Sequence, residues 1–242
     1  MKPTQRLYLD DDTAFAATAT IVAIDAQSIA CDRSCFYPGG GGQPPDQGEI
    51  ELADGRRSAV TDVRSDEAGV VWHSLAETPA PEWIGQTVGL RVDAARRIAL
   101  TRYHTVLHIL NTIALRDYDA WITGAQIGTD YSRIDFKVEG FSADMASALE
   151  AKANAVMAEG HGLGAYTLSE AEFAARGDLL RTLEVRPPIV DGRVRVVEIE
   201  GFDAQACGGT HAHDTRELGR LVIYKIENKG RINKRFYVRL EN

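Results

Sequence analysis

The chain has 242 residues, of which 44% are hydrophobic and 26% are charged, and its formal net charge at pH 7 is −8. This length suits one large domain or two ordinary ones, and the negative net charge argues against indiscriminate binding of nucleic acid. No apolar run approaches the roughly 18 residues of a membrane span, and there is neither a secretory signal nor enough cysteine for a disulfide framework, so we expect a cytoplasmic protein.

Residues 1–93 are expected to form a small β-barrel domain. Candidate strands, in which small, β-branched and polar residues alternate between turn signals, lie at 14–31, 58–64, 69–74 and 86–92. The run Phe36–Pro45 holds four consecutive glycines and three prolines, which neither a helix nor a central strand tolerates. We therefore predict a barrel-like unit that carries a glycine-rich loop. Cys31 and Cys35 lie in this half and are expected to be unpaired thiols rather than metal ligands.

The pattern becomes helical at Asp93, a plausible N-cap. From there to about Leu115, without glycine or proline, apolar residues recur at helical spacing, at Ile98, Val106, Ile109, Leu110 and Ile113. A second helix is expected over Ser142–Glu159, and a capping box at Ser169-x-x-Glu172 predicts a third helix that stops at Gly177. Strands are predicted at 193–200, 219–226 and 233–240, the last two joined by a hairpin turn. Residues 94–242 are thus expected to be an α+β domain with helices packed on a mostly antiparallel sheet.

Two short motifs in this second half contain candidate metal ligands. His104-x-x-x-His108 lies on the predicted helix, where side chains four residues apart share one face. Cys207-Gly-Gly-Thr-His211 lies in a loop, and we expect Gly208 and Gly209 to adopt positive φ so that the backbone can turn tightly. His213 competes with His211 for the fourth position and is ranked lower because the glycine turn favours His211. Together, three imidazoles and one thiolate match tetrahedral Zn²⁺.

The ligand set alone leaves the role of the metal open. Position 105 is threonine, which excludes the metalloprotease motif with glutamate after the first histidine. Four protein ligands normally indicate a closed structural zinc, whereas a catalytic zinc keeps one position open. The last stretch of the chain, residues 214–241, has eight basic residues against four acidic ones. That stretch is either a solvated strand face or a surface that contacts phosphate groups.

These motifs resemble the editing domain of alanyl-tRNA synthetases and of the free-standing AlaX trans-editing proteins. The resemblance covers nearly the whole chain, including the Cys-Gly-Gly-Thr-His segment, and its further matches are Arg195–His211, Glu217–Gly219, Gly230–Ile232, and Phe36–Pro38 with Gly41–Gln43. The last pair is similar to the glycine-rich motif of the longer, two-domain AlaX type. No aminoacylation domain is recognisable in residues 1–93, so amino-acid activation is not expected.

The resemblance implies a function and a set of site residues. Residues 94–242 would be a zinc-binding editing domain that hydrolyses serine, or alternatively glycine, from mischarged tRNA(Ala), with the acceptor end of that tRNA as partner and neither DNA nor a membrane. One Zn²⁺ per chain would be held by His104, His108, Cys207 and His211. The candidate catalytic residues are Thr123 and Gln126, with Thr105 and Thr210 as further polar residues that could approach the metal. The candidate tRNA-binding residues are Gly40, Gly41, Gly42, Gln43, Lys229, Arg231, Lys234 and Arg235.

Alternatives stay open at this point. Gly41-Gly42-Gln43 could contact the tRNA or pack against the metal domain. The protein could be a non-catalytic RNA-binding protein with a structural zinc, because all four ligands come from the chain. It could also be an editing deacylase for Ser-tRNA(Thr), because threonyl-tRNA synthetases have a related domain.

Overall fold

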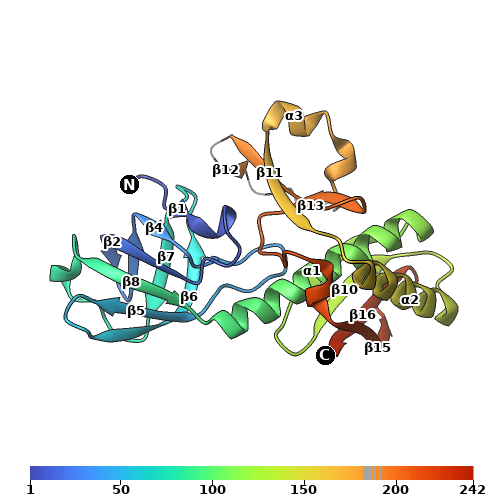
Figure 1. Ribbon diagram of the computed structural model, residues 1–242, viewed down its shortest axis with the longest axis horizontal. Coiled ribbons are helices and arrows are strands. Elements are labelled where there is room, and N and C mark those ends of the chain that lie inside the picture. Colours follow the sequence, from blue (N-terminus) through green and yellow to red (C-terminus); the bar gives the residue numbers. More distant parts are fainter. Residues whose placement is uncertain (182–186, 188, 191, 242) are drawn as a thin grey trace. The chain divides into compact units, whose positions relative to one another are not determined.

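The computed structural model describes residues 1–181, 187, 189–190 and 192–241 (Figure 1). The chain divides into two units. The first unit comprises Met1–Gly40 and Pro44–Ile98, and the second comprises Gly41–Gln43 and Ala99–Asn242. Three residues of the glycine-rich loop therefore belong to the second unit, although the rest of that loop belongs to the first.

The first unit is built on a closed six-stranded barrel, which confirms the predicted architecture. Its strand order is β2-β3-β7-β6-β5-β8, and each neighbouring pair is antiparallel. The barrel strands are β2 (Ala16–Asp25), β3 (Ser28–Cys31), β5 (Gly48–Leu52), β6 (Arg57–Ser65), β7 (Val71–Leu75) and β8 (Thr87–Val92). Smaller elements of this unit are β1 (Gln5–Arg6), β4 (Arg33–Ser34) and the 3-10 helices η1 (Leu7–Leu9) and η2 (Pro81–Trp83).

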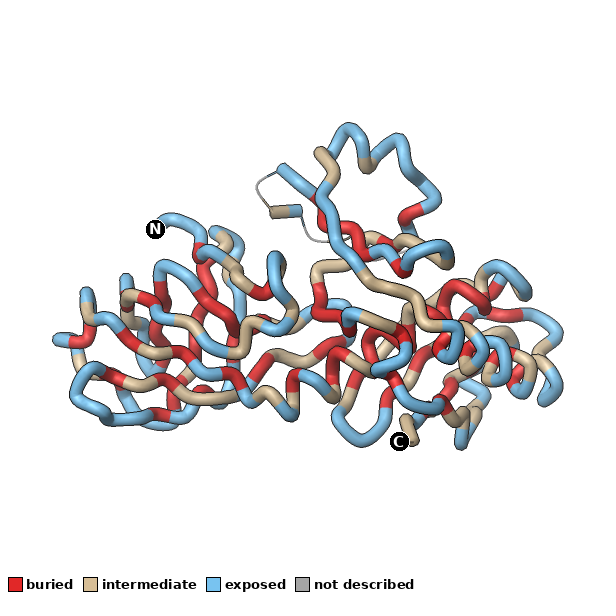
Figure 2. The backbone as a smooth tube through the Cα atoms, viewed as in Figure 1, coloured by how far each residue is buried: buried red, intermediate tan, exposed pale blue. Residues whose placement is uncertain are grey.

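Buried residues recur between more exposed ones along these strands (Figure 2), because successive side chains of a strand point to opposite faces of the sheet. Ile21, Ile50 and Leu90 are buried in the core of this unit. Cys31 and Cys35 belong to the same core as free thiols, as predicted. Burial raises the pKa of each thiol to about 12, so both stay protonated at neutral pH.

A buried ion pair holds the base of the glycine-rich loop. Arg97 and Asp46 are both fully buried, and Arg97 Nε lies 2.9 Å from each oxygen of the Asp46 carboxylate. The Asp46 carboxylate also accepts from the Tyr37 backbone N–H at 2.6 Å, and Arg97 Nη2 donates to the Cys35 carbonyl at 2.7 Å. The two ends of the loop are thus fixed within the first unit by charge-assisted hydrogen bonds.

The three predicted helices are present. In α1 (Ala94–Tyr118), Asp93 Oδ1 accepts from the Arg96 N–H at 3.0 Å, and the helix ends three residues later than expected. The apolar residues at helical spacing are buried, except for Ile98, which is 48% exposed. In α2 (Ala143–Glu159), the Ser142 hydroxyl accepts from the Met145 N–H, and Gly160 has φ of 79°. The capping box opens α3 (Glu170–Ala174), which stops before Gly177, and the 3-10 helix η3 (Gly177–Leu179) follows.

Two largely separate sheets complete the second unit, and the predicted α+β class is confirmed. The first sheet has the order β15-β16-β10-β9 and consists of β9 (Trp121–Gln126), β10 (Ser132–Lys137), β15 (Arg220–Asn228) and β16 (Asn233–Glu241). The second sheet consists of β11 (Leu163–Ser169), β12 (Ile189–Val190), β13 (Arg193–Ile199) and β14 (Asp203–Ala206). The 3-10 helix η4 (Thr215–Leu218) precedes β15. Ile134, Phe236 and Val238 of the first sheet share one core with residues of α1 and α2. No described helix is long and apolar enough to cross a membrane.

Candidate metal centre

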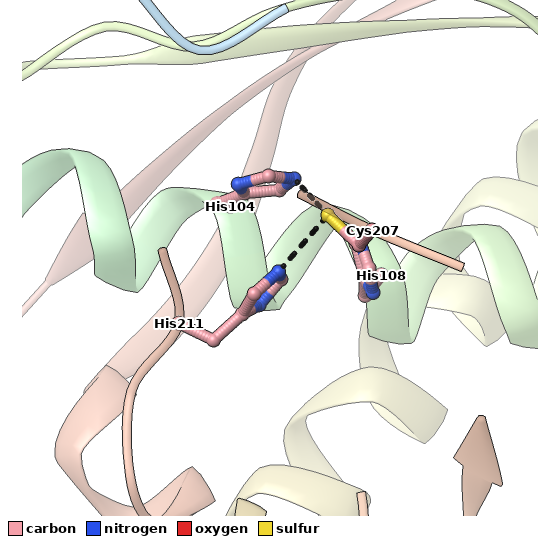
Figure 3. Close-up of side chains that lie close together, drawn as sticks. All are labelled: His104, His108, Cys207 and His211. Atoms are coloured by element: carbon pink, nitrogen blue, oxygen red, sulfur yellow. Dashed lines mark hydrogen bonds between the residues drawn. The ribbon is translucent and has the colours of Figure 1, made fainter. Parts of the chain in front are cut away.

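The structure brings the four predicted metal ligands together (Figure 3). One donor atom from each of His104, His108, Cys207 and His211 lies within 4.8 Å of the others. The first two side chains come from successive turns of α1, and the other two come from the loop after β14. His213, the weaker candidate from the sequence, is exposed and does not belong to this group.

Gln43 determines which nitrogen of His104 is available to a metal. The backbone N–H of Thr210 can only donate, and it lies 3.2 Å from Gln43 Oε1, so this atom is the carbonyl oxygen. The same oxygen lies 2.8 Å from His104 Nδ1, which must then carry the proton. Nε2 of His104 is left with its lone pair and lies 3.5 Å from Cys207 Sγ. The glycine-rich loop thus supplies the residue that fixes the tautomer of a candidate metal ligand.

Thr105 does the same for His211. Its hydroxyl donates to the Thr101 carbonyl at 3.1 Å and accepts from the Ala212 N–H at 3.1 Å. With its single proton used in this way, the hydroxyl accepts from His211 Nδ1 at 3.2 Å. Nε2 of His211 then faces Cys207 Sγ at 3.3 Å. Two imidazoles therefore present the same nitrogen to the thiol sulfur.

The glycines beside Cys207 act differently from the prediction. Neither Gly208 nor Gly209 has positive φ, so the expectation of a left-handed turn was wrong. A Cβ at Gly209 would lie 2.2 Å from the His104 ring and 2.9 Å from Gln43 Oε1. Gly209 is therefore required because the backbone passes against the imidazole, and its N–H lies 3.4 Å from Cys207 Sγ. Arg195 of β13 supports this turn by donating to the Gly209 carbonyl at 2.8 Å.

The chemistry of the four donors fits Zn²⁺. Burial lowers the pKa of all three imidazoles, and the charges of Arg181 and Arg195 add to this at His108, whose pKa falls to about 3. The imidazoles are consequently neutral at physiological pH, which is the form that binds a metal. Three neutral imidazoles and one thiol on opposed segments match the Cys and His sets that hold zinc.

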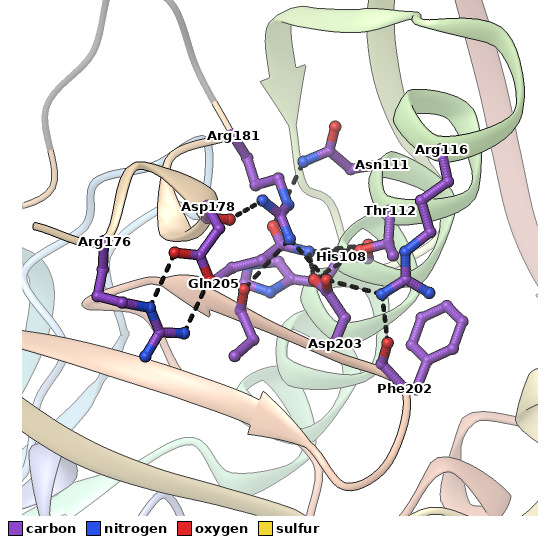
Figure 4. Close-up of polar contacts among 11 residues, drawn as sticks. His108, Asn111, Thr112, Arg116, Arg176, Asp178, Arg181, Phe202, Asp203 and Gln205 are labelled. Atoms are coloured by element: carbon purple, nitrogen blue, oxygen red, sulfur yellow. Dashed lines mark hydrogen bonds and ion pairs between the residues drawn. The ribbon is translucent and has the colours of Figure 1, made fainter.

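A polar network fixes the helical turn that carries His108 (Figure 4). Gln205 of β14 donates from Nε2 to the His108 carbonyl at 3.1 Å and to the Asp203 carboxylate at 2.9 Å. Asp203 also accepts from Thr112 of α1 at 2.7 Å and from Arg181 at 2.6 Å. Because β14 leads directly to Cys207, this network fixes the position of the Cys207 loop against α1. Sequence analysis did not identify Asp203 or Gln205 as part of the site.

The four other polar candidates fall into two groups. Thr105 and Thr210 are fully buried: Thr105 contacts His211, and Thr210 Oγ1 lies 2.8 Å from both Gln43 Nε2 and Thr101 Oγ1. Thr123 and Gln126 are exposed on β9. The Thr123 hydroxyl donates to the Asp135 carbonyl, and Gln126 Oε1 accepts from an arginine of β10. Neither belongs to the network that positions the donor atoms.

The candidate tRNA-binding residues also differ in their surroundings. Gly40, Gly41 and Gly42 are exposed with positive φ, whereas Gln43 is 2% exposed. The Gly42 carbonyl accepts from the Ile127 N–H at 2.9 Å.

At the basic end of the chain, the four candidates are engaged to different extents. Lys229 pairs with Glu227 at 3.3 Å, and Arg235 binds both carboxylate oxygens of Asp135 at 2.7 Å. Lys234 is buried, and its Nζ donates to backbone carbonyls of the hairpin turn. Arg231 is exposed in that turn. Lys229 and Arg235 are therefore already paired with carboxylates of the second unit, and Lys234 with its backbone carbonyls.

The chain is similar to known proteins over most of its length. The family model described as "Threonyl and Alanyl tRNA synthetase second additional domain" matches residues 194–237. The chain is 33% identical to the alanyl-tRNA editing protein AlaX-M of Saccharolobus solfataricus, over 97% of this chain and 98% of that protein. It is 36% identical to AlaX-M of Methanosarcina acetivorans, over 89% and 90% of the two chains. An alanine–tRNA ligase of Thermofilum pendens is 34% identical over 93% of this chain, which corresponds to 25% of the ligase.

Proposed function

The chain belongs to the family of AlaX-M alanyl-tRNA editing proteins, and from this premise we propose that it is a zinc-dependent deacylase that removes serine from mischarged tRNA(Ala). Editing of tRNA(Ala) by deacylation is the activity that family membership assigns. Zinc and serine are the finer parts of the proposal.

The observation that carries the proposal is the group His104, His108, Cys207 and His211. A zinc ion bound there would supply Lewis-acid polarisation of an ester or water oxygen. Gln43 and Thr105 hold His104 and His211 in the tautomer that leaves Nε2 available. The ester of an aminoacyl-tRNA is already activated, so the protein needs chiefly to orient it and to stabilise developing negative charge.

An asymmetry among the donors supports a catalytic role over a purely structural one. The ring nitrogens of His104 and His211 each have a partner on the side away from the thiol. Within the described part of the chain, the His108 ring has no hydrogen-bond partner, and the residue is less buried than the other two histidines. Gln205 donates to the backbone carbonyl of His108 and not to its ring. His108 would therefore be the least constrained of the three imidazoles that would hold the ion.

The direction of discrimination supports serine as the substrate. A site that hydrogen-bonds a hydroxyl rejects the analogue that lacks it by a large factor, because its polar groups would be left unpaired. Correctly charged Ala-tRNA(Ala) would then be spared. Thr105 already bonds His211 and Thr210 already bonds Gln43, so Thr123 and Gln126 are the candidates for reading the substrate hydroxyl. We expect Gln126→Ala or Thr123→Val to narrow the preference for serine over alanine if either residue has that role.

The test is a comparison of substrates with the zinc-loaded chain. Ser-tRNA(Ala), Gly-tRNA(Ala), Ala-tRNA(Ala) and Ser-tRNA(Thr) are incubated separately, and loss of each ester is followed. We expect fast hydrolysis of Ser-tRNA(Ala) and slow hydrolysis of Ala-tRNA(Ala). Tight binding of tRNA without turnover of any ester would favour an RNA-binding protein with a structural zinc. Preferential hydrolysis of Ser-tRNA(Thr) would show that tRNA(Thr), and not tRNA(Ala), carries the substrate.

A further inference from the structure

The outer face of the sheet β15-β16-β10-β9 carries side chains that take no part in the candidate metal centre. Along β10, Ser132, Ile134 and Phe136 are buried, whereas the alternate residues Arg133, Asp135 and Lys137 are not. The register places Arg133 opposite Tyr237 of β16 on the outer side. This outer side, which we call the open sheet face, therefore presents polar and aromatic side chains to solvent.

Three tyrosines form a row on the open sheet face. The rings of Tyr131 and Tyr224 lie 6.3 and 6.2 Å, centroid to centroid, from the ring of Tyr237 between them. Tyr131 is 51% exposed and Tyr224 is 43% exposed, so neither ring contributes much to the core. Exposed aromatic rings of this kind can stack on unpaired bases.

Cations surround this row. Lys225 Nζ lies 5.0 Å from the Tyr237 ring centroid, and Arg239 Cζ lies 5.9 Å from that of Tyr224. By register, the basic side chains of the face are Arg133, Lys137, Arg220, Lys225, Arg235 and Arg239, and the acidic ones are Asp135, Glu227 and Glu241. The face is thus net positive on a chain whose net charge is −8. Lys225 and Arg239 are exposed, and exposed ion pairs contribute little to stability, so these two cations can exchange their carboxylate partners for phosphates.

The open sheet face is also tied to the ligand-bearing helix. Tyr103, the residue before His104, donates its hydroxyl proton to the Asp130 carbonyl at 2.6 Å and accepts from the Leu240 N–H at 3.1 Å. Asp130 immediately precedes Tyr131, and Leu240 lies on β16. The Tyr103 side chain thus connects the backbone next to Tyr131, the C-terminal end of β16 and the turn of α1 that carries His104.

We propose that the open sheet face binds the RNA of the tRNA substrate, with the tyrosine row stacking on bases and the surrounding cations contacting phosphates. The inference rests on the proposed function, because that function supplies RNA as the occupant. Aromatic rings interleaved with basic residues on an open sheet match the chemistry of RNA, which combines exposed base faces with a regularly charged backbone. This surface extends beyond the glycine-rich loop and the four basic residues at the end of the chain.

The experiment measures binding of uncharged tRNA(Ala) directly by fluorescence anisotropy, with Tyr131→Leu/Tyr224→Leu as the test variant. Tyr166→Leu is the matched control, because Tyr166 is 36% exposed on β11 of the other sheet. We expect the Kd of the double variant to rise at least about fivefold for each base stack lost. Tyr131→Phe/Tyr224→Phe should bind like the unaltered protein, because the rings remain.

A second arm varies the salt concentration. Arg239→Gln should lower the slope of log Kd against log salt concentration by about 0.7 to 0.9, which corresponds to one phosphate contact. Arg57→Gln, an exposed arginine of β6 in the first unit, is the control and should leave the slope unchanged.

The outcomes separate this inference from the proposed function. Unchanged tRNA affinity in the leucine double variant, or an equal loss in Tyr166→Leu, would overturn the role of the open sheet face even if Ser-tRNA(Ala) is hydrolysed. A selective loss of affinity would support that role even if no ester is hydrolysed, and the proposed function would then fail on its own. Metal content and thermal unfolding of each variant confirm that the fold is intact.

Discussion

Buried histidines occur in both units, and their ring nitrogens have different partners. In the barrel, His73 is fully buried, with Nε2 2.8 Å from the Ser34 hydroxyl and Nδ1 3.3 Å from the Ile29 carbonyl. In the second unit, His104 has one nitrogen on Gln43 and the other facing Cys207. Burial lowers the pKa of both imidazoles. A low pKa therefore does not distinguish a core histidine from a ligand, whereas the partner of the second nitrogen does.

Other buried polar groups also differ between the two units in whether all their hydrogen-bonding atoms have a partner within the chain. In the first unit, Asp46 and Arg97 satisfy each other and the loop backbone. In the second unit, Gln43 and Thr105 satisfy only one nitrogen of each imidazole that they contact. We therefore expect substitutions in the first group to change stability, and substitutions in the second group to change metal binding and deacylation.

The largest effect is expected from Cys207→Ala, which removes the thiolate of the cluster. Zinc binding and deacylation should both fall by more than the roughly 10- to 100-fold typical of a lost supporting contact. Zinc content and the initial rate of ester hydrolysis measure the two effects. Cys31→Ala is the control, because burial holds the Cys31 pKa at about 12 and leaves its thiol protonated. A Cys207→Ala protein with one tightly bound zinc and full activity would remove Cys207 from the ligand set.

Asp46→Ala should have the next largest effect, this time on folding. The substitution leaves the Arg97 guanidinium buried without its carboxylate, which typically lowers the free energy of unfolding by about 3–5 kcal/mol. Denaturant unfolding measures the change, and zinc bound per folded chain should stay the same. Asp54→Ala removes an exposed pair with Arg56 in the same unit and should change the free energy of unfolding far less. If both substitutions lowered the free energy of unfolding equally, burial of the Asp46–Arg97 pair would not explain its importance.

His73 should make stability depend on pH. Burial lowers its pKa to about 4 in the folded chain, against about 6.5 when unfolded. The unfolded state binds the proton first, so this stabilisation is complete above pH 6.5 and is lost as the pH falls towards 4. The loss is about 3 kcal/mol at most. Unfolding of the native protein and of His73→Gln at pH 7, 5.5 and 4.5 tests this, and parallel pH curves would show that His73 is not responsible.

Gln43→Met should weaken zinc binding about 10- to 100-fold, because the His104 Nδ1–H loses its acceptor. Competition with a chromophoric chelator measures the affinity. Gln43→Glu should restore most of it, since a carboxylate oxygen can accept from the same N–H. Gln47→Met, at an exposed position of the first unit, is the control. If Gln43→Met bound zinc as tightly as this control, Gln43 would have only a packing role.

Local signals in the sequence predicted the three helices and every barrel strand except β5, which no candidate strand covered. The Asp93 cap, the Ser142 cap and the capping box at Ser169 act over three residues, so they can be read without knowing the fold. The strands β9 and β10 were not predicted. Residues of β9 are all intermediate or exposed, and the strand lacks the alternation that marks a half-buried strand.

The grouping of the four candidate ligands could be predicted from spacing, but the residues that support them could not. His104 and His108 are four residues apart on a helix, and Cys207 and His211 lie in one loop. Gln43 is 61 residues from His104, and its contact depends on how the chain folds back. Gly209 was correctly singled out for the wrong reason, because close approach to an imidazole depends on tertiary packing.

The most direct test of the account is the rate of Ser-tRNA(Ala) hydrolysis measured against zinc content. The protein is stripped with a chelator and reloaded stepwise, and both quantities are recorded at each step. We predict that the rate rises in proportion to bound zinc, reaches its maximum at about one ion per chain, and stays near background in Cys207→Ala. A full rate in the zinc-free protein would contradict the claim that the His₃Cys cluster is the centre of the editing reaction.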